Sequence, residues 1–396
     1  MKRRELIQGA GAGSLAAVAA SLLGPRIAVA GEAQPDSEAA AALAELQQTL
    51  DQLEAGFADP KFKLRTPQDF AEARRLLLHV LLHGLEAWLE ADPERPFFRP
   101  FIHQHKKLLG DNPDARYFSA VIDDRHRYRI RGNLAGATYT SFTVELAPDP
   151  DGPGVGTTLN DSQFKAGANG DYEIILSRDK AEGNWMQLPE GATSVTTRHY
   201  YEREQSINND RLHVIPIDIE NIDPAPPRQS PDDARIAAGI RRLTAFVKGN
   251  VLTVDADNSP AWVSRVPNQF EPPVIDDSNK NVGYAAVDNV YAMAPFVLGP
   301  DQALVIRGRF PRCRFANLVL WNRFMQTLDY ETRTISLNRA QAVQDEQGNF
   351  EIIVAHRDPG RPNWLDTEGR PYGLMFWRFQ LPEEEIRPLE TEVISL

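Results

Sequence analysis

The chain has 396 residues, 42% of them hydrophobic and 25% charged, which is the composition of an ordinary globular protein and enough chain for more than one core. Its formal net charge of −12 argues against nucleic acid or an anionic membrane as the main partner. The single cysteine, Cys313, excludes an intramolecular disulfide and any metal or iron–sulfur site built from several cysteines.

Residues 1–30 predict an export signal. Arg3 and Arg4 precede an apolar run rich in alanine and glycine, and the small residues Ala28 and Ala30 suit a cleavage site. The paired arginines resemble a twin-arginine signal, although Lys2 stands where serine or threonine is usual. We therefore expect the twin-arginine machinery to carry the folded chain to the periplasm. The apolar run is short and contains glycine, so no stable membrane anchor is expected.

Residues 31–112 are expected to form a helical annex. Leucines at helical spacing predict a first helix within residues 37–56. Thr66 as N-cap and Pro67 at the first helical position start a second helix, which should run to about Glu90. A third short helix is expected over residues 101–109. The side chains expected on the buried side of the second helix are Leu76, Leu77, Val80, Leu81, Leu85 and Trp88.

From Tyr117 the apolar period changes to two, which predicts strands. The first β-unit, residues 113–222, should hold strands at 128–132, 138–145, 171–176, 194–202 and 211–219. Residues 133–136 are expected to join the first two of these strands as a hairpin.

A proline-rich connector and a helix, residues 223–250, should separate the first β-unit from the second, residues 251–396. The helix is expected to start at Ser230 and Pro231 and to end at Lys248, before Gly249. Further strands are expected at 303–308, 315–321 and 332–337, and two apolar runs lie at 352–355 and 374–379. Short strands separated by turns about every 8–12 residues predict a β-sandwich or barrel rather than a parallel α/β sheet.

The loop between the last two apolar runs is the first candidate site. Proline and glycine break any regular element there, and His356 stands beside Arg357 and Asp358, with Asp366 further on. A histidine beside a carboxylate can do acid–base work, and an arginine can clamp an anion. The alternative is structural: Asp358 builds a turn, Arg357 pairs with a carboxylate, and Asp366 caps residues 368–369.

Residues 198–203 form the second candidate. In a strand, His199, Tyr201 and Arg203 face one way, and the alternate residues from Arg198 to Glu202 face the other. A face of histidine, tyrosine and arginine offers a proton shuttle, a hydroxyl donor and an anion clamp. The alternative is an exposed strand with cross-strand pairs.

No metal or other cofactor is expected. His79 and His83 lie four residues apart on one helix face, a spacing that can bind zinc, but Val80 stands where the His-Glu-x-x-His motif has glutamate. Solvated or buried histidines are the simpler interpretation. Cys313 lies between two arginines, which can lower a thiol pKa, and a structural strand cysteine is the alternative. Four tryptophans can line a ring-binding cleft or pack in the core: Trp262, Trp321, Trp364 and Trp377.

Several motifs in the last third of the chain occur in a fixed order. They are Leu320–Tyr330, Ser336–Arg339, Ala355–Gly360 and Pro362–Asp366. Together they resemble DUF1214, a domain of unknown function, over roughly residues 290–388. Residues 117–133 also resemble the upstream part of exported proteins of this DUF1254/DUF1214 type. The resemblance implies antiparallel β-sandwich, jelly-roll-like units with added helices, and it implies no settled chemistry.

Two functions remain open, both with a small-molecule partner. The first is a metal-independent hydrolase or lyase acting on a small polar or amphipathic periplasmic substrate, which requires a histidine within hydrogen-bond reach of a carboxylate. The second is a non-catalytic ligand-binding or accessory protein with an aromatic-lined cleft. The candidate catalytic residues are His356, Asp358, Asp366 and His199. The candidate binding residues are Arg357, Asn363, Trp364, Tyr201 and Arg203. The oligomeric state does not follow from the sequence.

Overall fold

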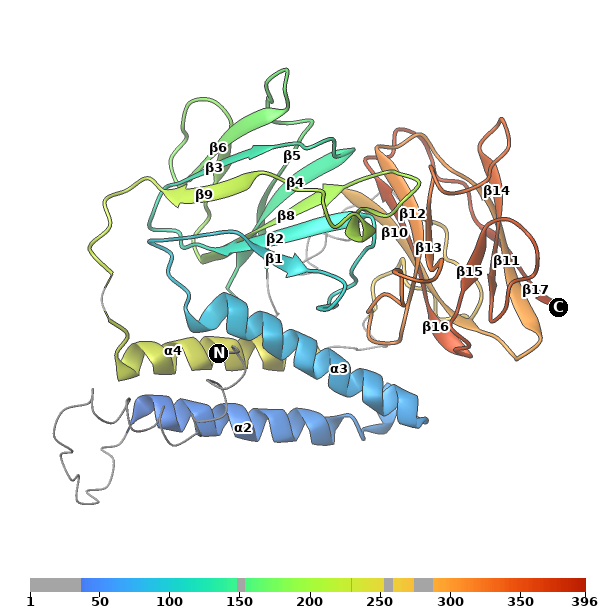
Figure 1. Ribbon diagram of the computed structural model, residues 1–396, viewed down its shortest axis with the longest axis horizontal. Coiled ribbons are helices and arrows are strands. Elements are labelled where there is room, and N and C mark those ends of the chain that lie inside the picture. Colours follow the sequence, from blue (N-terminus) through green and yellow to red (C-terminus); the bar gives the residue numbers. More distant parts are fainter. Residues whose placement is uncertain (1–36, 148–153, 229, 253–258, 274–287) are drawn as a thin grey trace, which may run out of the picture. The chain divides into compact units, whose positions relative to one another are not determined.

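The structure is a computed structural model that describes residues 37–147, 154–228, 230–252, 259–273 and 288–396. The expected export signal, residues 1–30, lies outside the described residues. The described part is mainly β, with seventeen strands in four sheets and three α-helices (Figure 1), so the expected fold class is confirmed. No helix in this part is both long and apolar enough to cross a membrane.

The three helices share one core. Thr66 caps α3 as expected: its hydroxyl accepts from the Asp69 amide, and the Asp69 carboxylate accepts from the Thr66 amide. Asp232, rather than Ser230, caps α4 by accepting from the Arg235 amide. The helices are α2 Glu38–Gly56, α3 Pro67–Gly84 and α4 Asp233–Val251, and the short turns beside them are η1 Pro60–Phe62 and the π-turn η2 Leu85–Leu89.

Two expectations for the helical annex are wrong. Leu85 is not buried but lies on the outer side of α3, with 40% of its surface exposed. Residues 101–109 do not form a helix, because the chain from Arg99 to Ile102 pairs with strand β2 (Ala115–Val121) as an edge strand. An edge strand tolerates Pro100, and it directs Phe101 and Ile102 into the helical core.

The first sandwich consists of two sheets with strand orders β1-β2-β8-β4-β5 and β7-β6-β3-β9. Their inner faces share a core in which Ile130 and Ile174 of one sheet meet Phe142 and Val195 of the other. The strands are β1 Arg99–Ile102, β2 Ala115–Val121, β3 Tyr128–Asn133, β4 Tyr139–Leu146, β5 Val155–Asn160, β6 Asp171–Ser177, β7 Trp185–Gln187, β8 Ala192–Tyr200 and β9 Ile217–Asn221.

The expected hairpin over residues 133–136 is wrong. β3 pairs with β6 and β9, whereas β4 pairs with β8 and β5 in the other sheet. Ala135 and Gly136 have positive φ, and the Ala135 amide donates to the Asn133 side chain, so a tight turn does form. Local turn chemistry predicted this turn, but the pairing partners are distant in the sequence.

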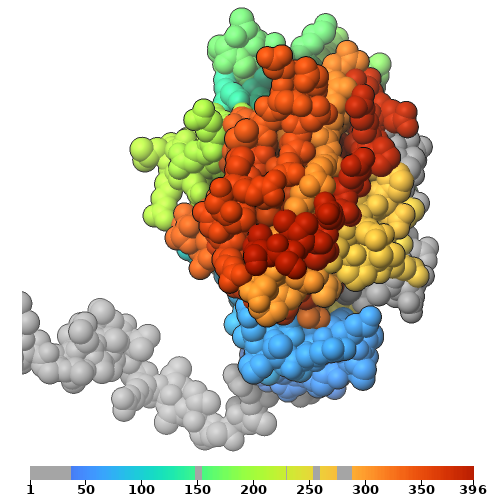
Figure 2. All heavy atoms as spheres, turned by 90° about the vertical axis from the view of Figure 1, so that its right-hand side faces the viewer, coloured from blue at the N-terminus to red at the C-terminus, as the bar shows by residue number. Residues whose placement is uncertain are grey.

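The second sandwich pairs the sheets β10-β16-β12-β13 and β15-β14-β11-β17. Figure 2 looks onto its outer surface. The candidate loop after Ala355 leads from β14 in one sheet to β16 in the other, and the expected strand at 332–337 shortens to three residues. The strands are β10 Asn289–Val297, β11 Gln302–Arg309, β12 Phe315–Trp321, β13 Ser336–Asn338, β14 Asn349–Ala355, β15 Trp364–Asp366, β16 Tyr372–Gln380 and β17 Glu390–Ser395.

Gly239 lets α4 approach η2 closely. A methyl group added there would lie 2.5 Å from the backbone carbonyl oxygen of Leu89, which cannot rotate away. We expect Gly239→Ala to lower the free energy of unfolding by roughly 1–3 kcal/mol, as overpacking does. Gly249 lies in the same helix with open space around it, so Gly249→Ala should be neutral or stabilising. Urea denaturation of both variants measures the difference, and equal effects would contradict the packing argument.

Candidate functional site

His356 is tied into its own loop. Its Nδ1 lies 2.6 Å from the Thr367 hydroxyl, and its Nε2 lies 3.4 Å from the Leu298 carbonyl oxygen. Among the described residues no carboxylate lies within hydrogen-bond distance of this imidazole. The histidine–carboxylate pair that the catalytic hypothesis requires is therefore not formed in this loop.

The charged residues of the loop make the contacts that the structural alternative describes. Arg357 pairs with Asp301 at 2.8 Å on the surface. Asp358 accepts from the Gly360 amide at 2.8 Å and so closes a turn. Asp366 accepts from the Glu368 amide at 2.7 Å and from Arg333 at 2.5 Å.

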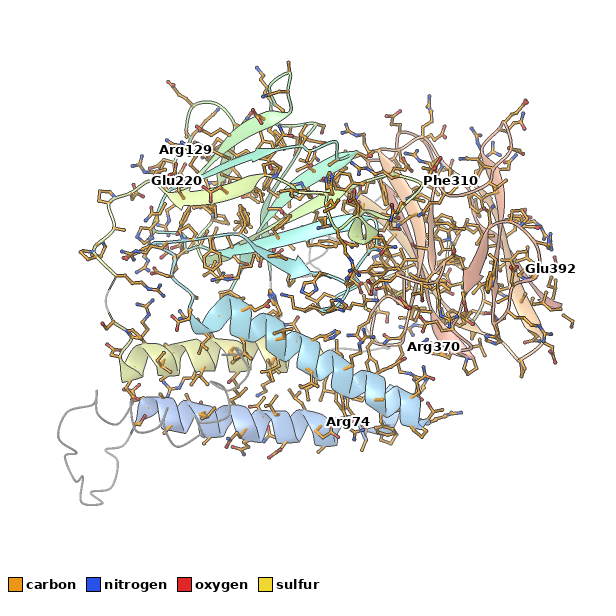
Figure 3. All side chains as sticks on the ribbon, in the orientation of Figure 1. Arg74, Arg129, Glu220, Phe310, Arg370 and Glu392 are labelled. Carbon is orange, nitrogen blue, oxygen red and sulfur yellow. The ribbon has the colours of Figure 1, made fainter. Side chains whose placement is uncertain are left out.

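Asn363 and Trp364 also hold the backbone in place. Asn363 has a left-handed φ of 58°, and its side chain exchanges two hydrogen bonds with the backbone of Val343. The Trp364 indole donates to the Ala355 carbonyl at 3.1 Å. At the end of the loop, Arg370 (labelled in Figure 3) binds Glu72 of α3. Hydrogen bonds and ion pairs thus hold the loop in place on the second sandwich.

Of the second candidate set, His199 lies inside the first sandwich, whereas Tyr201 and Arg203 follow the end of β8 and Arg203 is partly exposed. His199 is fully buried between the hydroxyls of Thr197 and Thr140, and burial lowers its pKa to about 3, so it is neutral. Tyr201 is hydrogen-bonded to His213, and Arg203 lies over the Tyr201 ring. No hydrogen bond, ion pair or ring contact among the described residues joins this set to the C-terminal loop.

The weaker candidates have structural surroundings. His79 is bonded to the Lys107 backbone, and His83 is buried beside two phenylalanine rings, where burial lowers its pKa to about 3. Burial raises the pKa of Cys313 to about 11, against the electrostatic effect of Arg339. Trp377 stacks in the sandwich core. Within the described part, no three His, Cys, Asp or Glu side chains are grouped to hold a metal ion.

A set of polar side chains lies on the other side of β8, where the first sandwich meets the second. This side carries Arg198 and Thr196, not His199. We call the set the seam cluster. It comprises Tyr117, Tyr139, Glu145, Thr196 and Arg198 of the first sandwich, with Asp288, Tyr291, Arg378 and Gln380 of the second.

The first wall of the seam cluster is a polar sheet face. Cross-strand pairing places Arg198 of β8 beside Tyr117 of β2 on one side and beside β4 on the other. The Arg198 guanidinium donates to Thr143 at 2.9 Å and lies 4.0 Å from Glu145. Burial disfavours its charge, but the attraction of Glu145 and nearby tyrosines outweighs burial, and the pKa of Arg198 is raised. The wall therefore holds a permanent buried cation.

The second wall is the outer face of the sheet that contains β10 and β16. Tyr291 and Arg378 are direct cross-strand partners on this face, and Gln380 follows Arg378 by two residues. One Arg378 nitrogen donates to the Gly110 carbonyl at 2.7 Å, and its guanidinium lies over the rings of Phe376 and Trp321. A second buried cation thus lies on an aromatic surface.

The two walls touch. Tyr139 donates to Asp288 at 2.6 Å, which fastens the start of β10 to β4. Burial raises the pKa of the Tyr117 hydroxyl well above its ordinary value. The positive charges of Arg378 and Arg198 act in the opposite direction but are weaker. A neutral phenol therefore lies near both guanidinium groups, and it shares a side-chain hydrogen bond with Tyr200.

Three side chains of the seam cluster keep polar atoms without a hydrogen-bond partner among the described residues. They are Nη1 of Arg378, Oγ1 of Thr196 and both amide atoms of Gln380, and all three side chains are buried. Arg378 also has no carboxylate within 4.0 Å in this part of the chain. Buried polar groups are nearly always paired, so these unpaired atoms are an exception that requires an explanation.

Sequence reasoning treated residues 198–203 as a candidate but placed its chemistry on the histidine side of the strand. The available signal was the run of Tyr139, Thr143 and Glu145, polar at every second position of β4, which predicts one polar sheet face. That this face is buried against a second sandwich could not be read from the pattern.

The fold and the site together define a protein of two β-sandwiches with a helical core and a buried polar seam. Residues 304–384 match the model of the family described as protein of unknown function, DUF1214, which confirms the resemblance found in the sequence. No curated protein matches the chain.

The solved structures that match the chain include two from bacteria. One is an uncharacterised protein of Burkholderia cenocepacia, with 27% identity and a TM-score of 0.78, over 89% of this chain and 96% of that one. Another, from Vibrio parahaemolyticus, has 10% identity and a TM-score of 0.47, over 82% of this chain and 98% of that one. The Burkholderia protein therefore shares the arrangement over most of the chain, and its description assigns no activity.

Proposed function

We propose that this protein binds a small organic anion in the seam cluster. The observation that carries the proposal is the free Nη1 of Arg378, buried and without an acceptor among the described residues. A buried charge is costly unless it is paired and hydrogen-bonded, and a guanidinium is the preferred partner of a carboxylate. An anion bound at this nitrogen would supply the missing hydrogen-bond acceptor and the missing negative charge.

The chemistry of the other unpartnered groups indicates which polar groups the ligand carries besides its carboxylate. Thr196 and Gln380 offer neutral donors and acceptors, which suit hydroxyl or carbonyl groups. The proposed ligand is therefore a small carboxylate that carries further polar groups.

Binding, rather than catalysis, is the function that these groups support. Arginine, threonine, glutamine and high-pKa tyrosine recognise polar groups but do not exchange protons near neutral pH. The hydrolase or lyase hypothesis depended on His356 or His199 with a carboxylate, but His356 contacts Thr367 and Leu298, and His199 contacts Thr140 and Thr197. A location in the periplasm is part of the proposal and is supported by the signal-like residues 1–30.

The proposal is tested by thermal shift and calorimetry with acetate, malate, gluconate, sulfate and inorganic phosphate. At least one carboxylate is expected to raise the melting temperature in a saturable way, because it binds only the folded state. Arg378→Gln should weaken that binding by roughly tenfold or more, as expected for a lost charged hydrogen bond. Arg378→Lys, which keeps the charge, should retain part of it.

Two further variants separate binding from folding. Thr196→Val removes an unpaired buried hydroxyl, so it should leave the free protein equally or more stable while it reduces the ligand-induced shift. Arg357→Gln on the C-terminal loop should change neither the stability of the free protein nor the ligand-induced shift in melting temperature. The proposal fails if no carboxylate stabilises the wild type, or if binding depends on Arg357 and not on Arg378.

A further inference from the structure

Helix α3 is apolar on two opposite faces. Its inner face packs into the helical core through Leu76, Leu77 and Val80. Its outer face carries Leu78 and Leu82, which are 60% and 39% exposed, and Leu85 of the following η2 turn continues the same side at 40%. A surface helix of a globular protein normally has one apolar face. A second, exposed apolar face therefore indicates a surface that contacts another molecule.

The three outer leucines form a single stripe. They follow one another at spacings of four and three residues, which places their side chains on one side of the helix. This alternation is the spacing by which a helix packs along a second helix. The surface therefore fits a helical partner better than an extended peptide.

We propose that this stripe docks the same stripe of a second copy of the chain, with the two α3 helices antiparallel about a twofold axis near Val80. Leu78 of one copy would lie opposite Leu82 of the other. An isologous contact of this kind requires a self-complementary surface, because each residue meets its counterpart from the other end.

The charges at the two ends of the stripe are complementary in this orientation. Arg74 (labelled in Figure 3) and Arg75 lie at the N-terminal end, and Glu86 and Glu90 lie at the C-terminal end. Within the chain Arg74 pairs with Glu54, Glu86 with Lys106 and Glu90 with Arg228, whereas Arg75 forms no ion pair within the described part of the chain. In an antiparallel pair Arg75 of one copy would lie at the end of the stripe that carries Glu86 in the other, whereas a parallel pair would place the two Arg75 side chains together.

The same charges argue against a membrane as the occupant. A helix that lies on a lipid surface is flanked by basic residues, but this stripe has both signs and belongs to a chain of net charge −12. One helix pair buries an area at the lower end of specific interfaces, below roughly 1,200 Å². The dimer is therefore expected to be weak and to dissociate on dilution.

Sedimentation equilibrium of the purified protein over a range of concentrations tests the proposal. The wild type should show a monomer–dimer equilibrium, and Leu82→Arg should weaken it by roughly tenfold or more, since it removes an apolar contact and adds charge repulsion. Arg75→Glu should weaken it at low salt and less at high salt. The matched controls are Leu43→Arg on α2, where Leu43 is 47% exposed, and Leu212→Arg, where Leu212 is 90% exposed. Both should leave the equilibrium unchanged.

Three results would overturn the proposal. The wild type could be monomeric at every concentration, or Leu82→Arg could dimerise as the wild type does. The wild type could also bind neutral or anionic lipid vesicles through Leu82 while remaining monomeric in solution, which would assign the stripe to a membrane. Leu82 is partly exposed, so Leu82→Arg is expected to fold. A circular dichroism spectrum equal to that of the wild type then excludes unfolding as the cause of a lost dimer.

Discussion

Asp111→Ala is expected to lower the free energy of unfolding by roughly 3–5 kcal/mol, the usual loss when one member of a buried charged pair is removed. Asp111 is fully buried, and its carboxylate accepts from both the amide and the hydroxyl of Thr327. Burial raises its pKa, and the charge of Lys107 opposes that rise. Without Asp111 the Lys107 ammonium loses a nearby buried negative charge and keeps the carbonyl oxygens of Thr327 and Leu328 and the face of the Tyr330 ring.

Urea denaturation measures this loss, and Asp301→Ala is its control. Asp301 also pairs with a cation, Arg357, but both side chains are exposed, and surface ion pairs contribute little. Similar losses in the two variants would show that burial of Asp111 is not the source of its effect.

Asp114→Asn is expected to stabilise the protein above neutral pH and to have little effect in acid. Asp114 is fully buried at the seam, where it accepts from the Asn317 side chain at 3.0 Å. Burial raises its pKa from 3.8 to about 6, although hydrogen bonds to its carboxylate oppose the shift. Asparagine keeps an acceptor oxygen and carries no charge at any pH.

The direction follows from proton linkage. Because the folded-state pKa lies above the unfolded value, the folded protein binds the extra proton, and the contribution of Asp114 to stability is complete below about pH 4 and is lost as the pH rises through about 6. The difference of 6 − 3.8, or about 2 pH units, corresponds to roughly 3 kcal/mol. Denaturation of both proteins at several pH values between about 4 and 8 measures this gap.

Asp345→Asn is a control for which the expected change in stability with pH has the opposite sign. Asp345 is at the surface, and hydrogen bonds from Asn349 lower its pKa. Its variant should lose stability at neutral pH and approach the wild type in acid. The linkage argument for Asp114 is contradicted if both variants change in the same direction with pH.

Local chemistry in the sequence predicted much of the fold. The capping box at Thr66, the apolar period of the helices and the alternation of β4, β8 and β12 concern residues close together in the chain, and these elements lie close to where they were expected. The errors concern pairing. β3 and β4 bond to different sheets, and residues 99–102 became an edge strand because β2 was available to pair with them.

The candidate site shows the same division. The sequence singled out residues 198–203 and the C-terminal loop for their chemical side chains. The structure shows that the loop residues bond to one another and to the backbone, and that His199 is buried between threonines. The unpartnered groups lie on the opposite side of β8 and on β16, and no pattern in the sequence connects these two strands.

By itself the sequence determined the mainly β class, the helix starts, the family resemblance and the alternation that separates Arg198 from His199. Only the tertiary structure decided which side of β8 would be covered, and by what. The reason is physical: alternation in a strand depends on neighbouring residues alone, but burial of a polar face depends on a second surface brought against it. Here that surface is the sheet that carries Arg378, 180 residues further along the chain from Arg198.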